Sequence, residues 1–565
     1  MSEEDNQDFG KEFERLDRDV HREILERLNE ARRPADLQEL GLDDPESREL
    51  RFAQSLLQHR NKLGPFGFTH LKQLEAIEGI DRKIIDLLIS LFGPRFRGKW
   101  DTPYETKLPD GSPYHIAHAI MLKTGHVLFL PEANLKTTML WDPSDLVNPQ
   151  FEFMVDQPDE FLFCTGHTHL SDGKVLVAGG GGGGPSGVNR AYKFDPVAKT
   201  WTRTAGDMSQ ARWYPTLLTL ADDSHVLVVG GAPSNDTTEI YDEATDNFSM
   251  MTGPGSTRSF PQLYPGLHLL PSGEVFYSRT GFGSAGPGPG GAGDPLNTNA
   301  FLRYSAPTTG TWNEIADVAE YPDRVRGMSV ILGGCDPHMA HVLVVGGTSS
   351  PGSETAQMIN LSTLTPKWEM PMNIPGGVAR NNVSAVLLPD GNVFVCGGTS
   401  DPSHPSAMFD PESETWSRMA RLNYRKQYHS VAVLLPSGKV MATGGSNFGG
   451  GSNVIEIFSP PYLFRGPRPQ ISSLPAHVNH GGTFDIESPD AHDISKVVMV
   501  RPMAVTHQTD TNQRVLVMPF KRTGHVLRAK APNGHFPHHT PRGNYLLFIL
   551  NDRGVPSEGQ FIKLR

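Results

Sequence analysis

The chain has 565 residues, 58 of them Gly and 46 Pro, and carries a formal net charge of −12. This length exceeds that of one ordinary domain and predicts about two to four domains. The negative charge argues against nucleic acid as the main partner and leaves small neutral or polar substrates open. So many turn-forming residues favour a fold built from many short strands.

The N-terminal segment is acidic and lacks the apolar region of a secretory signal peptide. No stretch of the sequence approaches the ~20 apolar residues that a membrane-spanning helix needs. As written, the sequence therefore predicts a cytoplasmic protein without a membrane segment.

Residues 1–95 are predicted to form a small helical region. The segment 9–33 has apolar residues at helical spacing among dense opposite charges, and three shorter segments of similar pattern follow at 50–64, 68–79 and 81–94. The last of these ends at a Gly-Pro pair, which is a typical helix stop.

From about residue 100 the pattern changes to strands that repeat. A turn, an apolar strand, a polar loop and a second strand recur seven times, and five of the seven apolar strands end in Gly-Gly. A period near ~50 residues with this content is typical of kelch-type β-propeller blades. We predict a seven-bladed propeller over residues 100–457, whose central strands start at Val127, Val175, Val226, Val275, Val342, Val393 and Val440.

The repeat ends before a Pro-rich linker, and residues 466–565 then alternate in strand fashion. About seven short strands in about 100 residues predict an immunoglobulin-like β-sandwich. The fold class is therefore mainly all-β: a propeller and a C-terminal sandwich, preceded by the helical region.

The chain has three cysteines, Cys164, Cys335 and Cys396, which do not suggest a disulfide framework. Cys396 lies in the apolar segment VFVCGG and is predicted to be a small buried residue. Cys164 precedes the second central strand, in FCTGH.

Tyr428 and His429 stand side by side before another apolar strand. Imidazole nitrogen and phenol oxygen are suitable ligands for copper, although this pair alone is more simply a strand-start aromatic residue and a surface histidine. Tyr214, in ARWYP, takes a comparable place in the third blade, and His507 lies in VTHQTDTNQR of the C-terminal region. Equivalent positions of different blades converge on the propeller axis, so Cys164, Tyr214 and the Tyr428–His429 pair can meet.

These motifs resemble those of the copper radical oxidases, the galactose oxidase and glyoxal oxidase family, over residues from about 100 to 565. The resemblance implies that Tyr214, Tyr428, His429 and His507 bind one copper ion per chain. It also implies a thioether bond between Cys164 and Tyr214, which makes Tyr214 a stable radical centre. The sulfur substituent would lower the oxidation potential of the Tyr214 phenol. Tyr428 would act as the general base that accepts the proton of the substrate hydroxyl.

Two features depart from galactose oxidase. That enzyme shields its radical with a tryptophan just after the Gly-Gly pair of the Tyr214 blade, where this chain has Ala232 and Pro233. Trp213 or His167 is the candidate for this role, although His167 is equally compatible with a solvated loop. The segment RWYPT is closer to glyoxal oxidase, which puts galactose as the substrate in doubt.

Two arginines, Arg324 and Arg326, lie in the loop YPDRVRG. They could line the substrate side, although charged rim residues usually only solvate a loop. No dinucleotide fingerprint is present, so we expect no nicotinamide or flavin.

The resemblance implies an oxidase that couples two-electron oxidation of a primary alcohol or hydrated aldehyde to reduction of O2 to H2O2. We expect a monomer that acts on a small molecule, with no nucleic acid and no membrane as partner. The main alternative is a non-catalytic kelch propeller that binds a protein or a glycan. A propeller hydrolase such as a sialidase would need an arginine triad and a carboxylate pair, which the sequence does not show.

Overall fold

The computed structural model forms two compact units, one of residues 1–99 with 460–465 and one of residues 100–459 with 466–565. The described residues are 25, 28, 48–63, 68, 73, 74, 77, 93–132, 135–181, 186–222, 224–260, 263–282, 299–306, 308–317, 319–321, 324–332, 340–347, 352–399, 404–445, 453–534 and 540–565. Cys335 and most of the predicted helical region lie outside them. The three predicted domain ranges stay predictions.

The first unit contains two described α-helices and a 3-10 helix. Helix α3 (Arg48–Lys62) falls on one of the predicted helical segments, and the shorter α5 (Pro94–Arg97) and η4 (Pro461–Phe464) complete the described elements. None of the helices in the described residues is long and apolar enough to cross a bilayer.

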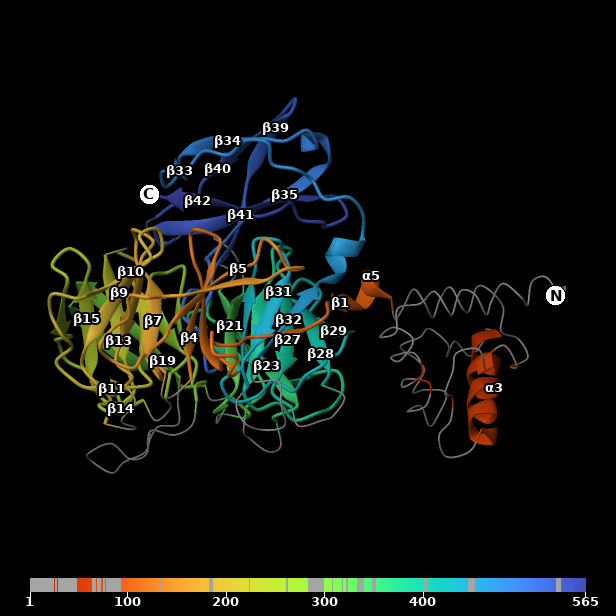
Figure 1. Ribbon diagram of the computed structural model, residues 1–565, viewed down its shortest axis with the longest axis horizontal. Coiled ribbons are helices and arrows are strands. Elements are labelled where there is room, and N and C mark those ends of the chain that lie inside the picture. The colour runs from red at the N-terminus through yellow and green to blue at the C-terminus, as the bar shows by residue number, and fades with distance from the viewer. Residues whose placement is uncertain are drawn as a thin grey trace. The chain divides into compact units, whose positions relative to one another are not determined.

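The second unit contains seven sheets of four or more strands between residues 99 and 510, counted over its described residues. Each of these sheets contains one predicted central strand, so the prediction of seven blades is confirmed. Figure 1 shows strands of these sheets, among them β7, β13, β21 and β27. In chain order the strands of the seven blades are β3 (Ile116–Met121), β4 (Val127–Pro131), β5 (Met139–Asp142), β6 (Gln150–Phe153); β7 (Gly166–His169), β8 (Val175–Ala178), β9 (Ala191–Asp195), β10 (Thr200–Arg203); β12 (Thr216–Thr219), β13 (His225–Val229), β15 (Thr238–Asp242), β16 (Asn247–Met250); β17 (Leu267–Leu269), β18 (Val275–Tyr277), β19 (Ala300–Ala306), β20 (Thr309–Glu314); β21 (Met328–Leu332), β22 (His341–Val345), β23 (Thr355–Asn360), β24 (Lys367–Trp368), β25 (Met372–Asn373); β26 (Val383–Leu387), β27 (Val393–Gly397), β28 (Ser406–Asp410), β29 (Thr415–Met419); and β30 (Val431–Leu434), β31 (Val440–Thr443), β32 (Val454–Ser459).

A strand that precedes the first blade in the chain closes the ring by pairing with the seventh blade. Two short strands, β1 (Lys99–Trp100) and β2 (Tyr104–Glu105), precede the first blade, and Tyr104 of β2 pairs with Ile455 of β32 in the seventh blade. Closure satisfies a sheet edge that would otherwise expose unpaired backbone groups. Trp100 also packs on Phe394 and Phe458 of the last two blades.

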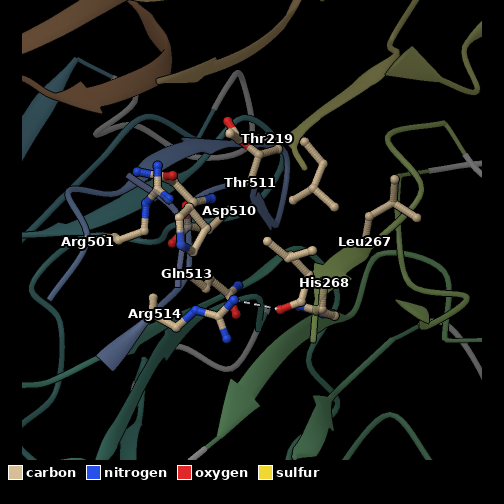
Figure 2. A pocket seen from close by; sticks show the side chains of 12 residues that line it. Thr219, Leu267, His268, Arg501, Asp510, Thr511, Gln513 and Arg514 are labelled. Carbon is tan, nitrogen blue, oxygen red and sulfur yellow. Dashed lines mark hydrogen bonds between the residues drawn. The ribbon is translucent and has the colours of Figure 1, made fainter. Parts of the chain in front are cut away.

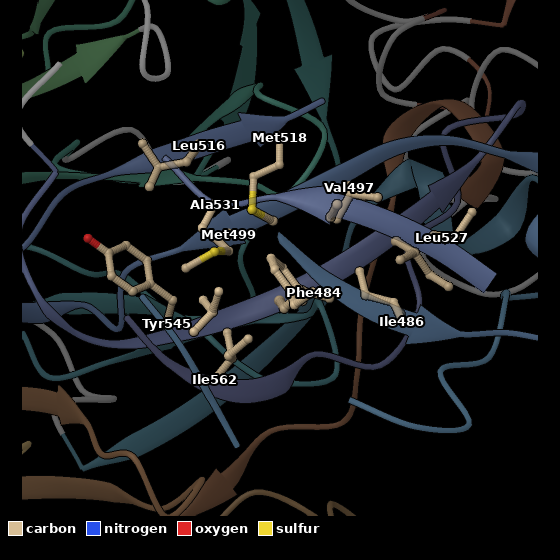
Figure 3. Packing of buried hydrophobic residues seen from close by; sticks show 14 of the residues in the cluster. Phe484, Ile486, Val497, Met499, Leu516, Met518, Leu527, Ala531, Tyr545 and Ile562 are labelled. Carbon is tan, nitrogen blue, oxygen red and sulfur yellow. The ribbon is translucent and has the colours of Figure 1, made fainter. Parts of the chain in front are cut away.

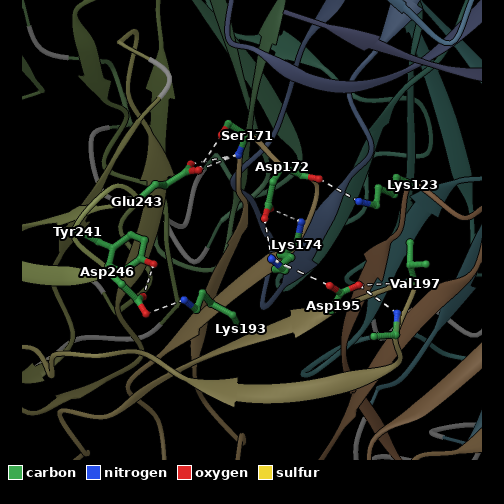
Figure 4. A network of polar contacts seen from close by, with 11 residues as sticks. Lys123, Ser171, Asp172, Lys174, Lys193, Asp195, Val197, Tyr241, Glu243 and Asp246 are labelled. Carbon is green, nitrogen blue, oxygen red and sulfur yellow. Dashed lines mark hydrogen bonds and ion pairs between the residues drawn. The ribbon is translucent and has the colours of Figure 1, made fainter.

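Polar side chains on the turns join neighbouring blades. Lys123 donates to the carbonyl oxygen of Asp172 at 2.9 Å, and Lys193 lies 2.7 Å from a carboxylate oxygen of Asp246 (Figure 4). Such half-exposed pairs contribute little individually, about 0–1 kcal/mol each. The blades are held mainly by the apolar clusters between them, for example the one that contains Leu176, Leu217 and Val226.

The C-terminal region adds two antiparallel-rich sheets that face each other across an apolar core. The core contains Met499, Leu516, Leu527 and Tyr545, all buried (Figure 3). One sheet has the strand order β33 (His477–Val478), β42 (Gln560–Leu564), β41 (Gly543–Asn551), β35 (Ile494–Val500), β38 (Val515–Met518). The other sheet has the order β34 (Thr483–Glu487), β40 (Val526–Lys530), β39 (Phe520–Thr523). The 3-10 helix η5 (Ala491–Asp493) connects β34 to β35 along the chain. The predicted fold class, a propeller followed by a β-sandwich, is confirmed.

Between β35 and β38 the chain leaves this sandwich as a hairpin. Its strands, β36 (Ala504–Thr506) and β37 (Thr509–Asp510), extend the first propeller blade, where Thr506 pairs with His118 of β3. A segment of the C-terminal region is thus part of a propeller sheet.

Candidate active site

In six blades a residue one to three positions before the first strand has a positive φ, although it is not glycine. Left-handed backbone costs such residues about 1–2 kcal/mol. A recurring cost of this kind suggests a function for the position. We call these six residues the inner ring: Cys164 (61°), Tyr214 (66°), Tyr264 (49°), Arg326 (63°), Asn382 (64°) and His429 (65°).

Backbone hydrogen bonds join members of the inner ring from blade to blade. The N–H of Tyr214 donates to the carbonyl oxygen of Cys164 and that of Tyr264 to Tyr214, both at 2.9 Å. Asn382 donates in the same way to Arg326 at 2.8 Å. The repeated bond gives Tyr214, Tyr264 and Asn382 the same backbone setting, so these side chains of different blades are presented alike.

The recurring Gly-Gly pairs make room for this arrangement. Gly231 lies beside Tyr214 with φ at 82°, and a Cβ there would stand 2.9 Å from the carbonyl oxygen of Trp213. Only glycine combines this backbone conformation with so close an approach. The Gly-Gly signature of the sequence is thus a requirement of the site's backbone.

His507 reaches the inner ring from the C-terminal hairpin. Thr506 pairs with Thr509, which leaves His507 and Gln508 as a two-residue turn with φ of 43° and 65°. Two positive φ values are the requirement of a type I′ turn, the one that suits the twist of a tight hairpin. The turn places the His507 side chain, fully buried, among the rings of Tyr214, Tyr264 and His429.

Two phenols and two imidazoles meet at this point. The hydroxyl oxygens of Tyr214 and Tyr428 lie 2.8 Å apart. The ring centroid of His507 is 4.8 Å from that of Tyr214 and 4.5 Å from that of His429. The structure therefore brings together the four residues proposed as ligands, which come from the third blade, the seventh blade and the hairpin.

The Nδ1 atoms of His429 and His507 each have a polar partner within hydrogen-bond distance. Nδ1 of His429 lies 3.0 Å from Oε1 of Glu132, and Nδ1 of His507 lies 2.7 Å from the hydroxyl of Thr506. Such bonds orient metal-binding imidazoles and select the other nitrogen for the metal. Nε2 of His507 is buried and, among the described residues, has no hydrogen-bond partner.

The electrostatics of the four side chains fit a divalent cation. Burial lowers the pKa of His507 well below its ordinary value, which keeps its imidazole neutral. Burial raises the pKa of Tyr428 to about 12 and that of Tyr214 further, so neither phenol ionises without a compensating positive charge. No group of three His, Cys, Asp or Glu side chains suited to a metal occurs in the described part of the chain. A metal here would instead use imidazoles and phenolates, which suits Cu(II).

Cys164 lies beside Tyr214 in a buried apolar cluster with Tyr264 and Leu263. Burial raises the pKa of its thiol, and an interaction with the Tyr214 phenol partly offsets this. Cys164 and Cys396 are both free and buried, as predicted for Cys396. The thiol of Cys164 differs from that of Cys396 in having a tyrosine beside it.

Aromatic rings cover the two phenols. Trp213 lies 4.1 Å from the Tyr214 ring between centroids, tilted by 40°. Its strand β11 (Arg212–Trp213) pairs with β14 (Ala232–Pro233), so Trp213 lies opposite the small residue Ala232. Phe282 stacks on Tyr428 at 4.7 Å. Of the two residues considered for shielding, Trp213 contacts the Tyr214 ring directly.

His167 lies farther from Tyr214, on strand β7. Its Nε2 is 3.2 Å from Nδ1 of His118, whose ring centroid is 6.0 Å from that of His507. Burial lowers the pKa of His167 to about 3. His167 is therefore a buried neutral residue of a strand, and the alternative interpretation of it as a solvated loop residue was wrong. No ring contact joins it to Tyr214 among the described residues.

Arg324 points into its own blade. It is 2% exposed and donates to the carbonyl oxygens of Gly346, Gly352 and Thr355 at 2.7–3.1 Å. These bonds hold the guanidinium inside the blade, so Arg324 fastens the blade's loops and the expectation that it lines the substrate side was wrong. Arg212 and Arg380 make comparable bonds to Gly230 and Gly397 in other blades.

Sequence reasoning missed Glu132, Tyr264, Phe282 and Asn382. Tyr264 and Asn382 had a signal, because they take the repeat position of Tyr214 and His429 before the first strand of a blade. Glu132 and Phe282 follow central strands in segments without a shared pattern, and no signal marks them.

A separate small cavity lies between the third blade, the fourth blade and the C-terminal hairpin β36–β37. It is lined by Arg501, Asp510 and Arg514 from the C-terminal region and by Thr219 and His268 from the blades (Figure 2). None of the four proposed ligands lines it. Burial raises the pKa of Asp510 to about 7, although the carboxylate accepts backbone hydrogen bonds from Ala504 and Asn512.

Comparisons with known proteins agree with this fold. Residues 468–564 match the family model described as galactose oxidase-like, early set domain, and residues 167–206 match the kelch motif. A galactose oxidase of Gibberella zeae is 25% identical over 470 residues, which are 76% of this chain and 64% of that protein. The aldehyde oxidase GLOX of Vitis pseudoreticulata is 26% identical over 454 residues, 71% of this chain and 82% of that protein.

Aldehyde oxidase GLOX1 of Arabidopsis thaliana is 27% identical over 469 residues, 71% of this chain and 72% of that protein. A solved structure described as a fungal alcohol oxidase of the AA5 family in complex with copper superposes with a TM-score of 0.66 at 22% identity, covering 83% of this chain and 99% of that one. The chain thus spans 64% of the length of the galactose oxidase, and the resemblance that its motifs indicate is confirmed.

Proposed function

We propose that this protein is a copper-dependent oxidase that converts a primary alcohol or a hydrated aldehyde, with O2, to the aldehyde or acid and H2O2. The observation that carries the proposal is the convergence of two phenols and two imidazoles, with the phenol oxygens 2.8 Å apart and Nε2 of His507 buried without a described partner. The relatives named galactose oxidase and aldehyde oxidase support it.

In this proposal Nε2 of His429, Nε2 of His507 and the hydroxyl oxygens of Tyr214 and Tyr428 bind one copper ion. Copper bound there supplies a Lewis acid for the substrate hydroxyl and accepts one of the two electrons. Tyr428 Oη receives the hydroxyl proton, as a general base at the more exposed of the two phenols.

The second electron requires another redox centre, and we assign it to Tyr214 linked to Cys164 by a thioether. Linking them forms one S–C bond, breaks one S–H and one ring C–H bond, and transfers two hydrogens to O2 as H2O2. The buried, adjacent positions of Cys164 and Tyr214 support this link. Trp213, 4.1 Å from the Tyr214 ring, would exclude water from the oxidised phenol.

The test is oxygen uptake and peroxide release by copper-loaded protein over a panel of alcohols and aldehydes. We expect turnover without added flavin or nicotinamide, and loss of both copper binding and turnover in His507→Ala. His492→Ala, a change at a histidine with 73% of its side chain exposed, is the control. A copper-loaded protein that binds no substrate and consumes no oxygen would instead support the non-catalytic propeller.

A further inference from the structure

Arg326 is the inner-ring member of the fifth blade, the counterpart of Cys164, Tyr214 and His429 in other blades. Its backbone is fixed on both sides: its N–H donates to Gly281 at 2.6 Å and its carbonyl oxygen accepts from Asn382 at 2.8 Å. The strained φ of 63° is therefore set by two neighbouring blades. The position is built in the same way as those that carry the proposed chemistry.

The guanidinium of Arg326 lies against the aromatic wall of the site. Its central carbon is 5.4 Å from the Phe282 ring centroid, and Phe282 stacks on Tyr428 at 4.7 Å. The Phe282 ring is also 5.3 Å from that of His507. Arg326 is near enough for its positive charge to favour the Tyr428 phenolate, a minor lowering contribution to the pKa of that group.

Arg326 differs from the arginines that hold the blades together. Arg212, Arg324 and Arg380 each donate to backbone carbonyl oxygens. Within the described residues the Arg326 guanidinium makes no hydrogen bond or ion pair, and its one contact is with the Phe282 ring. A half-buried guanidinium with five N–H donors and only an aromatic face as partner is suited to an oxyanion ligand.

Asn382, the next member of the inner ring, also has a side-chain atom without a hydrogen-bond partner among the described residues. It is 5% exposed, and its side-chain oxygen is buried without a hydrogen-bond partner among the described residues. A carboxylate has no donor for this oxygen, so a hydrogen bond from Asn382 to a carboxylate would come from the N–H groups of its amide. Arg326 thus offers a charged group at the aromatic wall of the site, and Asn382 offers a polar side chain at the equivalent position of the next blade.

We propose that Arg326 and Asn382 form the recognition subsite for a carboxylate on the substrate, which would be an alcohol or aldehyde that also carries an acid group. This inference rests on the proposed oxidase function. The inner ring contains one cation, Arg326, which matches the single charge of a carboxylate and its two-oxygen geometry. The Asn382 amide can donate to the same group from the neighbouring blade. A phosphate, with about two charges, would lack a second cation in the ring.

The first experiment compares ω-hydroxy carboxylic acids of increasing chain length with the matching diols as substrates of the copper-loaded protein. We expect a preference in kcat/KM for one acid, reduced about 10–100-fold in Arg326→Met, the range expected for a charge-assisted hydrogen bond. Arg326→Lys should keep part of the preference, and Asn382→Asp should weaken it through its added negative charge. The readout is the ratio of kcat/KM for the acid to kcat/KM for the matching diol, so that a general effect of Arg326→Met on turnover cancels.

Arg203→Met is the matched control, because Arg203 is half-exposed and pairs with Asp207 on an outer strand. It should leave the preference unchanged. Equal use of acids and diols by the unaltered protein, or an unchanged preference in Arg326→Met, would overturn the proposal.

The second experiment titrates the same acids into copper-free protein by calorimetry, where no turnover can occur. Binding of the preferred acid should weaken about tenfold or more in Arg326→Met and stay unchanged in Arg203→Met. This measurement separates the two proposals: absence of oxygen uptake with intact, Arg326-dependent acid binding would refute the oxidase and keep the subsite. Absence of Arg326-dependent binding would refute the subsite.

Discussion

The carboxylate of Glu132 lies 3.0 Å from Nδ1 of His429. The carboxylate comes from the loop after β4 in the first blade and the histidine from the seventh, so the contact joins the two ends of the propeller ring. It fixes which nitrogen of His429 faces the other proposed ligands and raises the basicity of that nitrogen.

Glu132→Gln should therefore lower copper affinity about 10–100-fold, because second-shell carboxylates contribute that much to metal sites. Competition with a copper chelator gives the affinity, and electron paramagnetic resonance reports the changed copper environment. Glu152→Gln, at a half-exposed residue of the same blade, should change neither. An unaltered affinity and spectrum in Glu132→Gln would show that the contact does not position His429.

Copper affinity should rise with pH. The pKa of Tyr428 is raised to about 12 and that of Tyr214 is raised further, so both phenols are protonated in the metal-free protein at neutral pH. The His507 imidazole is neutral there because its pKa is lowered by burial. Binding to two phenolates releases two protons, and the affinity should then increase about 100-fold per pH unit near neutrality.

Calorimetry in buffers of different ionisation enthalpy counts the released protons. Tyr428→Phe should remove one of the two, and the pH dependence should fall to about tenfold per unit. Proton release near zero in the unaltered protein would mean that the phenols stay protonated and do not bind the metal.

Copper and O2 should lower the intact mass by about 2 Da through the bond between Cys164 and Tyr214. Peptide mapping should show the two segments joined and resistant to reducing agents. Cys396→Ala is the matched control, since Cys396 is also free and buried but has no assigned tyrosine partner. The mass loss should persist in that variant and vanish in Cys164→Ala. A freely alkylatable Cys164 in copper-treated protein would contradict the thioether.

Replacing Trp213 by Ala should expose the Tyr214 ring, whose centroid lies 4.1 Å from that of Trp213. The oxidised protein should then lose its radical absorbance about tenfold faster or more, because water reaches the phenol. Trp416→Ala, a change on the outer strand β29, serves as control. Equal lifetimes in the two variants would assign the shielding to another residue, with Phe282 the next to test.

The sequence predicted the repeat well because each blade carries the same local pattern. The strand starts at Val175 and Val393 follow from apolar runs that end in Gly-Gly, and the structure has strands β8 and β27 there. The proposed ligand set could be found in the sequence only through resemblance, because His507 and Tyr214 are 293 positions apart and meet through the hairpin.

The different side-chain contacts of Arg324 and Arg326 could not be predicted from the sequence. They are separated by one residue, yet one donates to carbonyl oxygens inside its blade and the other contacts Phe282. The difference comes from the left-handed backbone at Arg326, which the neighbouring blades impose. Glu132 was missed for a similar reason, since its partner His429 follows it by 297 positions.

The pairing of Tyr104 with Ile455 has a consequence for biosynthesis. A ribosome releases the first strand of this pair roughly 350 residues before the second, so the ring cannot close while most of the chain is being made. His507 emerges later still. Contacts of such sequence separation form late in folding. A nascent or truncated chain therefore presents Tyr214 without its imidazole neighbours, and the oxidative chemistry proposed for Tyr214 would be deferred until translation is almost complete.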